Sequence, residues 1–233
     1  MSRGASDSFQ APLRYLPRKP IEEVRKGRVI YSPVNPTERV YLVMRGRVKV
    51  ATTTAEGCET IVRILCAEDF LGEAVLVGGR SSEAAVVLDP ALLMSWTRDE
   101  IEAQIERQPR LGLALAQYFV RQCLTLQERF EAAALHKAPE RVLLAFAQLA
   151  RLLGTPQPDG AIRVDSLTHQ TIADYVGTSR EIVTFQMNRF RRLGLIGYNR
   201  HYIDVYSRAV TEALRQHAID LPERPPSQST VSQ

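Results

Sequence analysis

The stretch SLTHQTIADYVGTSREIVTFQMNRFRRLGLI, residues 166–196, constrains the fold more than any other part of the chain. Ala173, Gly177 and Val183 stand at relative positions 1, 5 and 11. A helix-turn-helix needs a small residue where its helices cross, a turn residue that accepts a positive φ, and a branched apolar residue that locks the second helix. The spacing therefore predicts this motif, with Thr168 as the N-cap of the first helix.

The second predicted helix begins near Thr178 or Ser179 and turns one face inward. Four apolar side chains are expected on that inward face: Ile182, Val183, Met187 and Phe190. Arg180, Glu181 and Thr184 fall on one exposed face at positions i, i+1 and i+4. The letters GYNRHYIDVY that follow Ile196 predict a two-stranded hairpin, so the unit is expected to be winged.

The exposed face has the chemistry needed to read base edges. The first turns of such a helix enter the major groove, where arginine can bond guanine O6 and N7 together and glutamate can accept from cytosine N4. The Thr184 methyl group or the Phe185 ring could contact a thymine methyl group. Residues 166–208 carry six arginines and three acidic residues, which accounts for +3 of the formal net charge of +4. The sequence therefore predicts double-stranded DNA as a partner.

A purely structural alternative exists for the same four residues. Thr178-Ser179-Arg180-Glu181 also fits a capping box, in which Glu181 reaches back to the N-cap amide. Because the tetrapeptide lies inside a complete helix-turn-helix in the basic part of the chain, we favour base reading.

Residues 21–97 consist of short β-type segments separated by turn signals, as expected for a sandwich or barrel. RVYLVMRGRVKVATTTAEGCETIVRIL predicts three strands, with Gly46 at one bend and Ala55-Glu56-Gly57 at a hairpin turn. AAVVLDPALLMSW predicts two further strands around Asp89-Pro90.

The pattern changes to a helical period at residues 110–137. One near-heptad seam contains Leu115, Phe119, Cys123, Leu126 and Phe130, and a second apolar stripe contains Leu113, Ala116, Val120 and Leu124. A helix that is apolar on two faces needs two packing partners, its own β-domain and a second copy of the chain. We expect the seam to form a homodimer interface, and the alternative is a core helix of a monomer.

Several classes of protein are disfavoured by composition. No apolar run approaches the length of roughly 20 residues that a membrane span needs, and the first residues lack the pattern of a signal peptide. The chain has three cysteines without C-x-x-C spacing, so we expect neither a disulfide framework nor a zinc site. We expect a cytoplasmic protein with no membrane partner, and with flexible ends at residues 1–20 and, beyond the end of a C-terminal helix, within residues 211–233.

An enzyme built on the β-domain, such as a cupin-type metal oxygenase, would need clustered histidine and carboxylate ligands there. The first histidine is His136, beyond the β-domain. We therefore expect no enzymatic activity, no catalytic residues and no metal site.

From about residue 21 to 210 the chain resembles the Crp/Fnr family of bacterial transcription regulators. The similarity includes GRVKV, the hairpin closing into CETIVRILCAEDFLGEA, the long helix, and GTSRE in the winged helix. The resemblance implies an α+β fold with a cyclic-nucleotide-binding-type β-roll (jelly roll) at residues 21–108. It also implies a dimerisation helix at 109–137 and a winged helix-turn-helix at 138–210. Family members often activate transcription by contacting RNA polymerase, which we expect as a partner.

The resemblance also implies roles for individual residues. Arg180 and Glu181 match the pair that reads a G·C pair in a TGTGA-type half-site, and Gln170 and Ser179 match phosphate contacts. Phe185 stands where members that respond to cyclic AMP have a further base-reading arginine, so we expect the outer bases of the half-site to differ. Thr168 and Arg189 complete the DNA-binding candidates.

The match is poorer at the effector site. In members that bind cyclic AMP, a Gly-Glu pair holds the ribose and an Arg-Ser pair about ten residues later holds the phosphate. Gly72 and Glu73 are present, but Glu83 and Ala84 stand at the second position, and only a shorter loop would bring in Arg80-Ser81. The polar pair that contacts adenine corresponds to Leu126 and Gln127. We therefore expect no cofactor.

Two alternatives remain for regulation, dependence on cyclic AMP or a ligand-sensing module that acts through protein contacts. The cysteines and histidines of iron–sulfur or haem sensing are absent from the expected places. Cys58 and Cys66 could form a thiol switch, although inert cysteines are the interpretation we favour.

Overall fold

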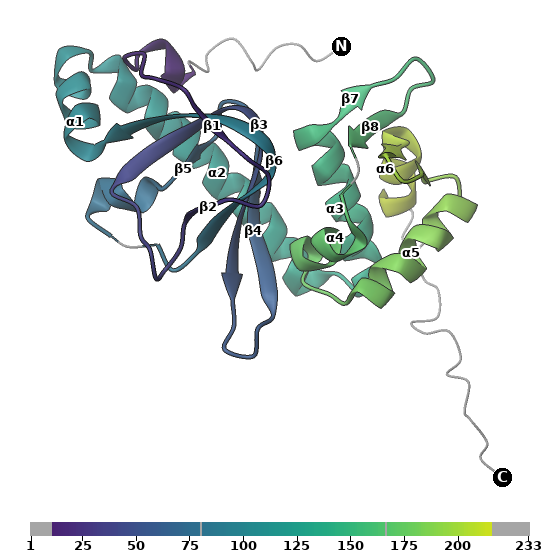
Figure 1. Cartoon of the computed structure of the whole chain (residues 1–233). Helices are drawn as coiled ribbons and strands as arrows, with labels where there is room; N and C mark the ends of the chain where they lie inside the picture. The colour runs from purple at the N-terminus through teal and green to yellow at the C-terminus, as the bar shows by residue number, and fades with distance from the viewer. Residues whose placement is uncertain (1–10, 80, 166, 216–233) are drawn as a thin grey trace. The chain divides into compact units, whose positions relative to one another are not determined.

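The computed structural model describes residues 11–79, 81–165 and 167–215, which form two compact units (Figure 1). Unit 1 comprises Met1–Leu135 and Thr168–Arg180, and unit 2 comprises His136–Leu167 and Glu181–Gln233, each as far as its residues are described. The first helix of the helix-turn-helix thus groups with the β-roll, whereas the sequence placed it in a domain of residues 138–210.

Unit 1 contains an antiparallel sheet with the strand order β1-β6-β3-β4, in which β2 pairs with β6 and β5 with β3. Its strands are β1 (Glu22–Val24), β2 (Val29–Tyr31), β3 (Arg39–Thr53), β4 (Glu59–Leu65), β5 (Phe70–Leu71) and β6 (Ala84–Thr97), and a short 3-10 helix, η2 (Glu73–Val77), follows β5. The mixed α+β class and the β-roll are as predicted.

Two predicted strand breaks are bends within long strands. Gly46 lies inside β3 and Pro90 inside β6, and the register between these strands shifts near both residues. Gly46 has a φ of 89°, and a Cβ there would lie 2.4 Å from the Pro90 carbonyl oxygen. The bends therefore fit each other, which allows two long strands to curl where four short ones were expected.

Two hydrophobic clusters form the core of unit 1. One lies within the roll and includes Val43, Val48 and Leu65. The other includes Trp96 and Phe70, together with apolar residues of the two helices that follow the roll, α1 (Arg98–Arg107) and α2 (Arg110–Leu135). Thr97 begins α1 with a complete capping box.

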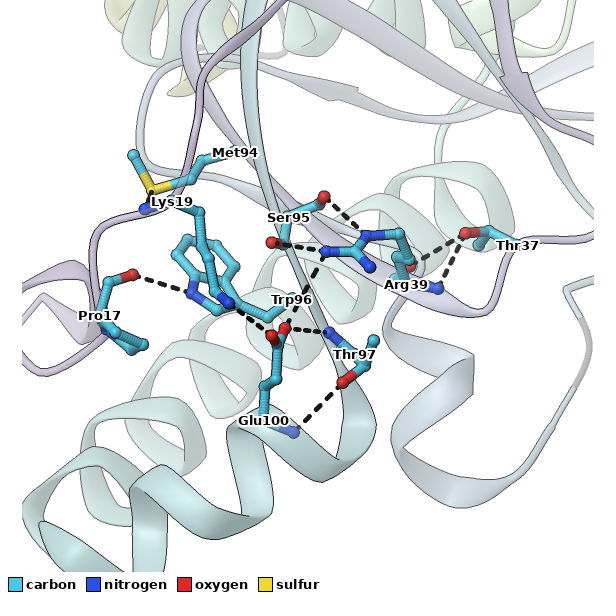
Figure 2. A network of polar contacts seen from close by, with 9 residues as sticks. All are labelled: Pro17, Lys19, Thr37, Arg39, Met94, Ser95, Trp96, Thr97 and Glu100. Atoms are coloured by element: carbon cyan, nitrogen blue, oxygen red, sulfur yellow. Dashed lines mark hydrogen bonds and ion pairs between the residues drawn. The ribbon is translucent and has the colours of Figure 1, made fainter.

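The segment before the roll is packed and does not match the predicted flexible N-terminus, at least from residue 11 onward; residues 1–10 lie outside the described part. Leu16 is 7% exposed and belongs to the cluster around Trp96. The Trp96 indole Nε1 donates to the Pro17 carbonyl oxygen at 2.9 Å, and Lys19 pairs with the capping glutamate Glu100 (Figure 2). Such an irregular strap leaves no periodic signal in the sequence, because its backbone bonds to side chains.

A second part of the same network holds the start of β3 against the end of β6. Arg39 donates through Nε to the Ser95 hydroxyl group at 2.8 Å and through Nη2 to the Ser95 carbonyl oxygen at 3.1 Å (Figure 2). The Thr37 hydroxyl group accepts from the Arg39 amide at 2.9 Å. These bonds fix the edge of the roll beside the capping box of α1.

Helix α2 buries one face within unit 1 and leaves another exposed. Leu115 is 6% exposed and Phe119 is half-buried, and both pack in the cluster around Trp96. Leu115 therefore belongs to the intrachain core, which corrects its assignment to the dimer seam. The exposed large apolar side chains are Leu113, Val120, Leu124, Leu126, Phe130 and Leu135, and Ala116 and Cys123 are also exposed. The exposed set thus contains the second predicted stripe and the C-terminal half of the first, which lie on different sides of the helix.

Unit 2 is a winged helical unit. It contains α3 (Ala138–Leu153), α5 (Arg180–Arg192), α6 (Ser207–Arg215) and a small sheet of β7 (Thr155–Pro156), β8 (Ile162–Asp165), β10 (Tyr202–Val205) and β9 (Ile196–Tyr198) in that order. The predicted hairpin is present as β9 and β10. Arg163 donates to both carboxylate oxygens of Asp204, at 2.7 and 2.8 Å, and covers the Tyr202 ring at 3.6 Å, which joins β8 to β10.

Two observations concern membrane spans and metal sites. Within the described residues, no helix is long and apolar enough to cross a membrane. The same residues contain no cluster of three or more histidine, cysteine or acidic side chains that could hold a metal ion.

Candidate nucleic-acid interface and roll cavity

The helix-turn-helix begins and turns as the sequence predicts. The Thr168 side chain accepts from the Thr171 amide at 3.0 Å and caps α4 (His169–Val176). Gly177 ends α4 with a φ of 73°, in the left-handed region that favours glycine. The Gly177 and Thr178 amides both donate to the Ala173 carbonyl oxygen, at 2.8 and 3.0 Å. The next helix, α5, then begins at Arg180.

The exposed start of α5 carries the predicted base-reading residues. Arg180 and Glu181 are exposed, and Thr184 and Phe185 are half-buried. Ile182 is 38% exposed, so its predicted inward orientation is wrong. The buried face is centred on Val183, Gln186, Met187 and Phe190. Ile182 lies at the edge of that face, because each residue turns the helix by about 100°.

Arg189 does not belong to the DNA-facing set. It is 7% exposed, and its Nη2 is buried without a hydrogen-bond partner in the described part of the chain. Burial, and then the neighbouring charge of Arg192, lowers the pKa of Arg189. Arg189 follows Arg180 by nine positions, and nine steps of about 100° bring it to the opposite side of the helix. The structure therefore removes Arg189 from the candidates.

A residue that the sequence analysis missed lies on the same side of α5 as Thr184. Asn188 follows Thr184 by four residues and donates to the Thr184 carbonyl oxygen at 3.1 Å. Its side-chain oxygen accepts from the Tyr198 hydroxyl group at 2.8 Å, and Arg191 lies over the Tyr198 ring at 5.1 Å. The wing strand β9 thereby holds the middle of α5, and only the i+4 spacing could have indicated Asn188.

The remaining candidates lie at or near α4. Gln170 is exposed and donates to Asp174 Oδ1 at 2.7 Å, so this amide is held along the helix. Thr168 is exposed at the start of α4, and Ser179 is exposed directly before α5. Burial, and then the charge of Arg180, lowers the pKa of His169 at the start of α4. The His169 side chain is therefore neutral at neutral pH and adds no positive charge beside Arg180.

The roll contains a cavity of about 480 Å³ beside α2. Among the predicted effector residues, it brings together Gly72, Glu73, Ser81 and Glu83. Gln127 does not line this cavity and donates to Glu131 at 3.0 Å on the exposed surface, so that expectation is wrong. Arg80 lies outside the described residues. On α2 the lining side chains are Phe119, Gln122, Cys123 and Leu126.

The charged group that the sequence analysis missed in this cavity is Arg63 on β4. Its Nη2 lies 2.5 Å from Glu73 Oε1, which satisfies the carboxylate within the chain. Glu83 accepts from the Ser81 hydroxyl group at 3.4 Å. The described lining therefore presents two carboxylates and one guanidinium, and one carboxylate already engages the guanidinium.

A glycine is required at position 72 by the backbone geometry, independently of any ligand. Its φ is 79°, and a Cβ there would lie 2.5 Å from the Arg39 carbonyl oxygen. Any other residue would push β5 away from the start of β3, so this glycine is needed for the close approach of two backbone segments.

Of the two cysteines considered for a thiol switch, Cys66 has an inert environment. Burial, and then the charge of Asp69, raises its pKa to about 12. The Cys66 thiol donates to Asp69 Oδ2 at 3.4 Å, and Cys58 is exposed in the β3–β4 hairpin. Cys66 is thus protonated at neutral pH and a poor nucleophile.

Comparisons with known proteins agree with this architecture. Residues 21–108 match the cyclic nucleotide-binding domain, and residues 133–212 match the Crp-like helix-turn-helix domain. A global nitrogen regulator of Synechocystis sp. is 30% identical over 191 residues, which cover 80% of this chain and 84% of that protein. A CRP-like cAMP-activated global transcriptional regulator of Mycobacterium tuberculosis is 28% identical over 173 residues, with coverage of 73% and 77%.

Solved structures show the same fold. FixK2 from Bradyrhizobium japonicum superposes with a TM-score of 0.72 at 21% identity, covering 88% of this chain and 98% of that chain. A CRP/FNR-family transcriptional regulator from Thermus thermophilus gives a TM-score of 0.69 at 23% identity, covering 84% and 98%.

Proposed function

The chain belongs to the Crp/Fnr family of transcription regulators, and we propose that it is a homodimeric activator that reads a TGTGA-like palindrome without a cyclic nucleotide. The observation that carries the proposal is the exposed pair Arg180 and Glu181 at the start of α5, directly after the Gly177 turn. This pair can bond guanine and cytosine across one base pair of the major groove.

The dimer is supported by the outward face of α2. Leu113 is 62% exposed, Val120 58% and Leu124 55%, and their spacing places them on one side of α2 as an apolar strip in contact with solvent in one chain. Phe130, which is 74% exposed, adds apolar surface further along the helix. Contiguous exposed apolar surface of this kind marks an interaction site. A second copy of α2 would cover it and would set two recognition helices about 34 Å apart, one turn of DNA.

Independence from cyclic nucleotides is supported by the charge of the roll cavity. The guanidinium of Arg63 is already paired with Glu73, and Glu83 adds a second carboxylate. A cyclic phosphate placed there would lie beside like charge in a partly desolvated site, which disfavours it. As an activator the protein would act in the cytoplasm and contact RNA polymerase.

Phe185 defines where the half-site should depart from TGTGA. It is half-buried on the DNA-facing side and cannot bond guanine as an arginine would. We therefore propose that the inner G·C pair is retained and that the outer position is read through the ring or not at all.

The test is fluorescence anisotropy on a labelled TGTGA-N6-TCACA duplex and on a scrambled duplex, at two salt concentrations, with and without cyclic AMP. We expect selective binding that cyclic AMP does not change. Arg180→Ala should weaken binding to the palindrome by roughly 5- to 150-fold, the value of one bidentate base contact, and should affect the scrambled duplex much less. Arg151→Ala, an exposed arginine on α3, serves as the matched control of charge.

Each arm can overturn one part of the proposal. Equal affinity for the two duplexes would refute reading of a TGTGA-like site. Binding that requires cyclic AMP would refute nucleotide independence and would indicate that the cavity accepts a phosphate. A monomer by analytical ultracentrifugation at micromolar concentration would refute the dimer.

A further inference from the structure

Strand β4 contains a bulge that exposes backbone acceptors beside the cavity. Arg63 pairs with Val50 and Ile61 pairs with Ala51, so Val62 is an extra residue in the ladder. An extra residue of this kind has no paired residue on the neighbouring strand. The Arg129 side chain of α2 occupies this place, because Nη1 donates to the Val62 carbonyl oxygen and Nη2 donates to the Ile61 carbonyl oxygen at 2.9 Å.

The same guanidinium also holds the end of α4. Its Nη2 donates to the Tyr175 carbonyl oxygen at 2.7 Å, and its central carbon lies 4.1 Å from the centroid of the Tyr175 ring. The last four carbonyl groups of a helix have no partner within the helix, and a cation there is favoured by the helix dipole. Arg129 therefore acts as a C-cap for α4 that is supplied by another helix.

Arg129 is held by neutral groups. Its hydrogen-bond acceptors within the described residues are backbone carbonyl oxygens, and burial lowers the pKa of its guanidinium. A charge in this setting is stabilised only while β4 and α4 both remain in place. Three carbonyl groups from two elements also require the planar fork of arginine, which the single ammonium group of lysine does not reproduce.

We propose that Arg129 is the positioning residue that fixes the first helix of the helix-turn-helix to strand β4 of the roll. Helix α4 has eight residues, too few to be stable alone. Its place in unit 1 therefore depends on contacts such as this one. Strand β4 also supplies Val62 and Arg63 to the cavity. The strand that forms part of the cavity wall is therefore also the strand to which Arg129 joins α4.

The proposal rests on DNA binding by α5, and it is tested with Arg129→Met, Arg129→Lys and the control Arg121→Met, an exposed arginine on the same helix. Amide hydrogen exchange of residues 168–176 is measured on the free full-length proteins. Affinity for the TGTGA duplex is measured over a range of salt concentrations. Far-ultraviolet circular dichroism and the emission of Trp96 establish that each variant is folded.

We expect α4 amides to exchange about tenfold faster or more in both Arg129 variants, and the affinity for the duplex to fall by a similar factor. The slope of log Kd against log salt should not change, because Arg129 bonds to protein carbonyls and not to phosphate. Arg121→Met should leave the exchange of α4 unchanged. If Arg129→Met does not fold, Arg129→Lys alone decides the matter.

Unchanged exchange of α4 in a folded Arg129 variant would overturn the proposal. A salt slope lowered by about one would also overturn it, because that is the signature of a lost phosphate contact. If the unaltered protein does not discriminate between duplexes, the proposed function fails. The exchange of α4 still decides whether Arg129 holds this helix.

Discussion

Replacing Tyr118 with phenylalanine tests how tightly α2 is bound to the roll. The Tyr118 side chain is 5% exposed, and its hydroxyl group accepts from the Phe70 amide at 2.9 Å and donates to Asp69 Oδ1 at 3.3 Å. Its ring also meets the Phe70 ring edge-on with centroids 5.2 Å apart. The substitution keeps the ring contacts and removes only the hydroxyl group.

The expected loss of stability follows from the polar groups that lose their partner in the variant. The Phe70 amide would lose its acceptor in a buried place, which costs about 1–3 kcal/mol. The lost bond to Asp69 adds little, because it is long and Gln122 donates to the same carboxylate oxygen at 3.4 Å. We therefore expect the free energy of unfolding of unit 1 to fall by about 1–3 kcal/mol. With a urea m-value of about 2 kcal/mol/M, the midpoint moves down by about 0.5–1.5 M.

The assay uses the one tryptophan of the chain, Trp96, which is fully buried in the same hydrophobic cluster. Urea unfolding followed by its fluorescence reports on unit 1. Tyr202→Phe, a change in unit 2 that keeps the ring under Arg163, is the matched control and should leave the midpoint unchanged. A midpoint for Tyr118→Phe within about 0.2 M of the unaltered protein, well below the expected shift, would refute the reasoning, because the Phe70 amide would then have another acceptor.

Three further predictions concern single residues. The Cys66 thiol, with a pKa raised to about 12, should be alkylated by iodoacetamide at pH 8 more slowly than exposed Cys58, by roughly tenfold or more, and mass spectrometry of the timed reaction measures the ratio. Gly46→Ala should destabilise unit 1 by about 2 kcal/mol or more, because its Cβ would meet the Pro90 carbonyl oxygen at a positive φ; a normal urea midpoint would contradict this. The pKa of His169 is lowered on folding, so the unfolded chain binds more protons below about pH 6.5 and stability falls there. His169→Gln should lose less stability than the unaltered protein between pH 7.5 and 5.5, as measured by urea unfolding.

The architecture could be predicted from the sequence where periodicity and turn chemistry agree. The roll, the long helix, the N-cap at Thr168 and the turn at Gly177 all depend on local rules, and each is confirmed. The strap at residues 11–20 could not be predicted, because it is stabilised by long-range partners such as Trp96 and Glu100. Contacts between residues some 80 positions apart leave no pattern in a single sequence.

The candidate sites, too, were predicted correctly only where local sequence rules apply. Arg180 and Glu181 were found from their place in the motif, and they are exposed. Arg63 was missed because the bulge at Val62 breaks the alternation by which strand faces are assigned. Arg189 was wrongly included because residue type was considered without its angle around the helix.

Gly72 and Glu73 match a nucleotide-binding signature, and both also have a structural role in the roll. Gly72 is needed where β5 approaches the Arg39 carbonyl oxygen, and Glu73 neutralises Arg63 inside the roll. Both residues therefore contribute to folding whether or not a ribose is ever bound. A stable roll therefore uses this pair for reasons that do not involve a nucleotide. The presence of these two letters in a sequence is thus explained by the framework of the roll alone and does not by itself report a bound ligand.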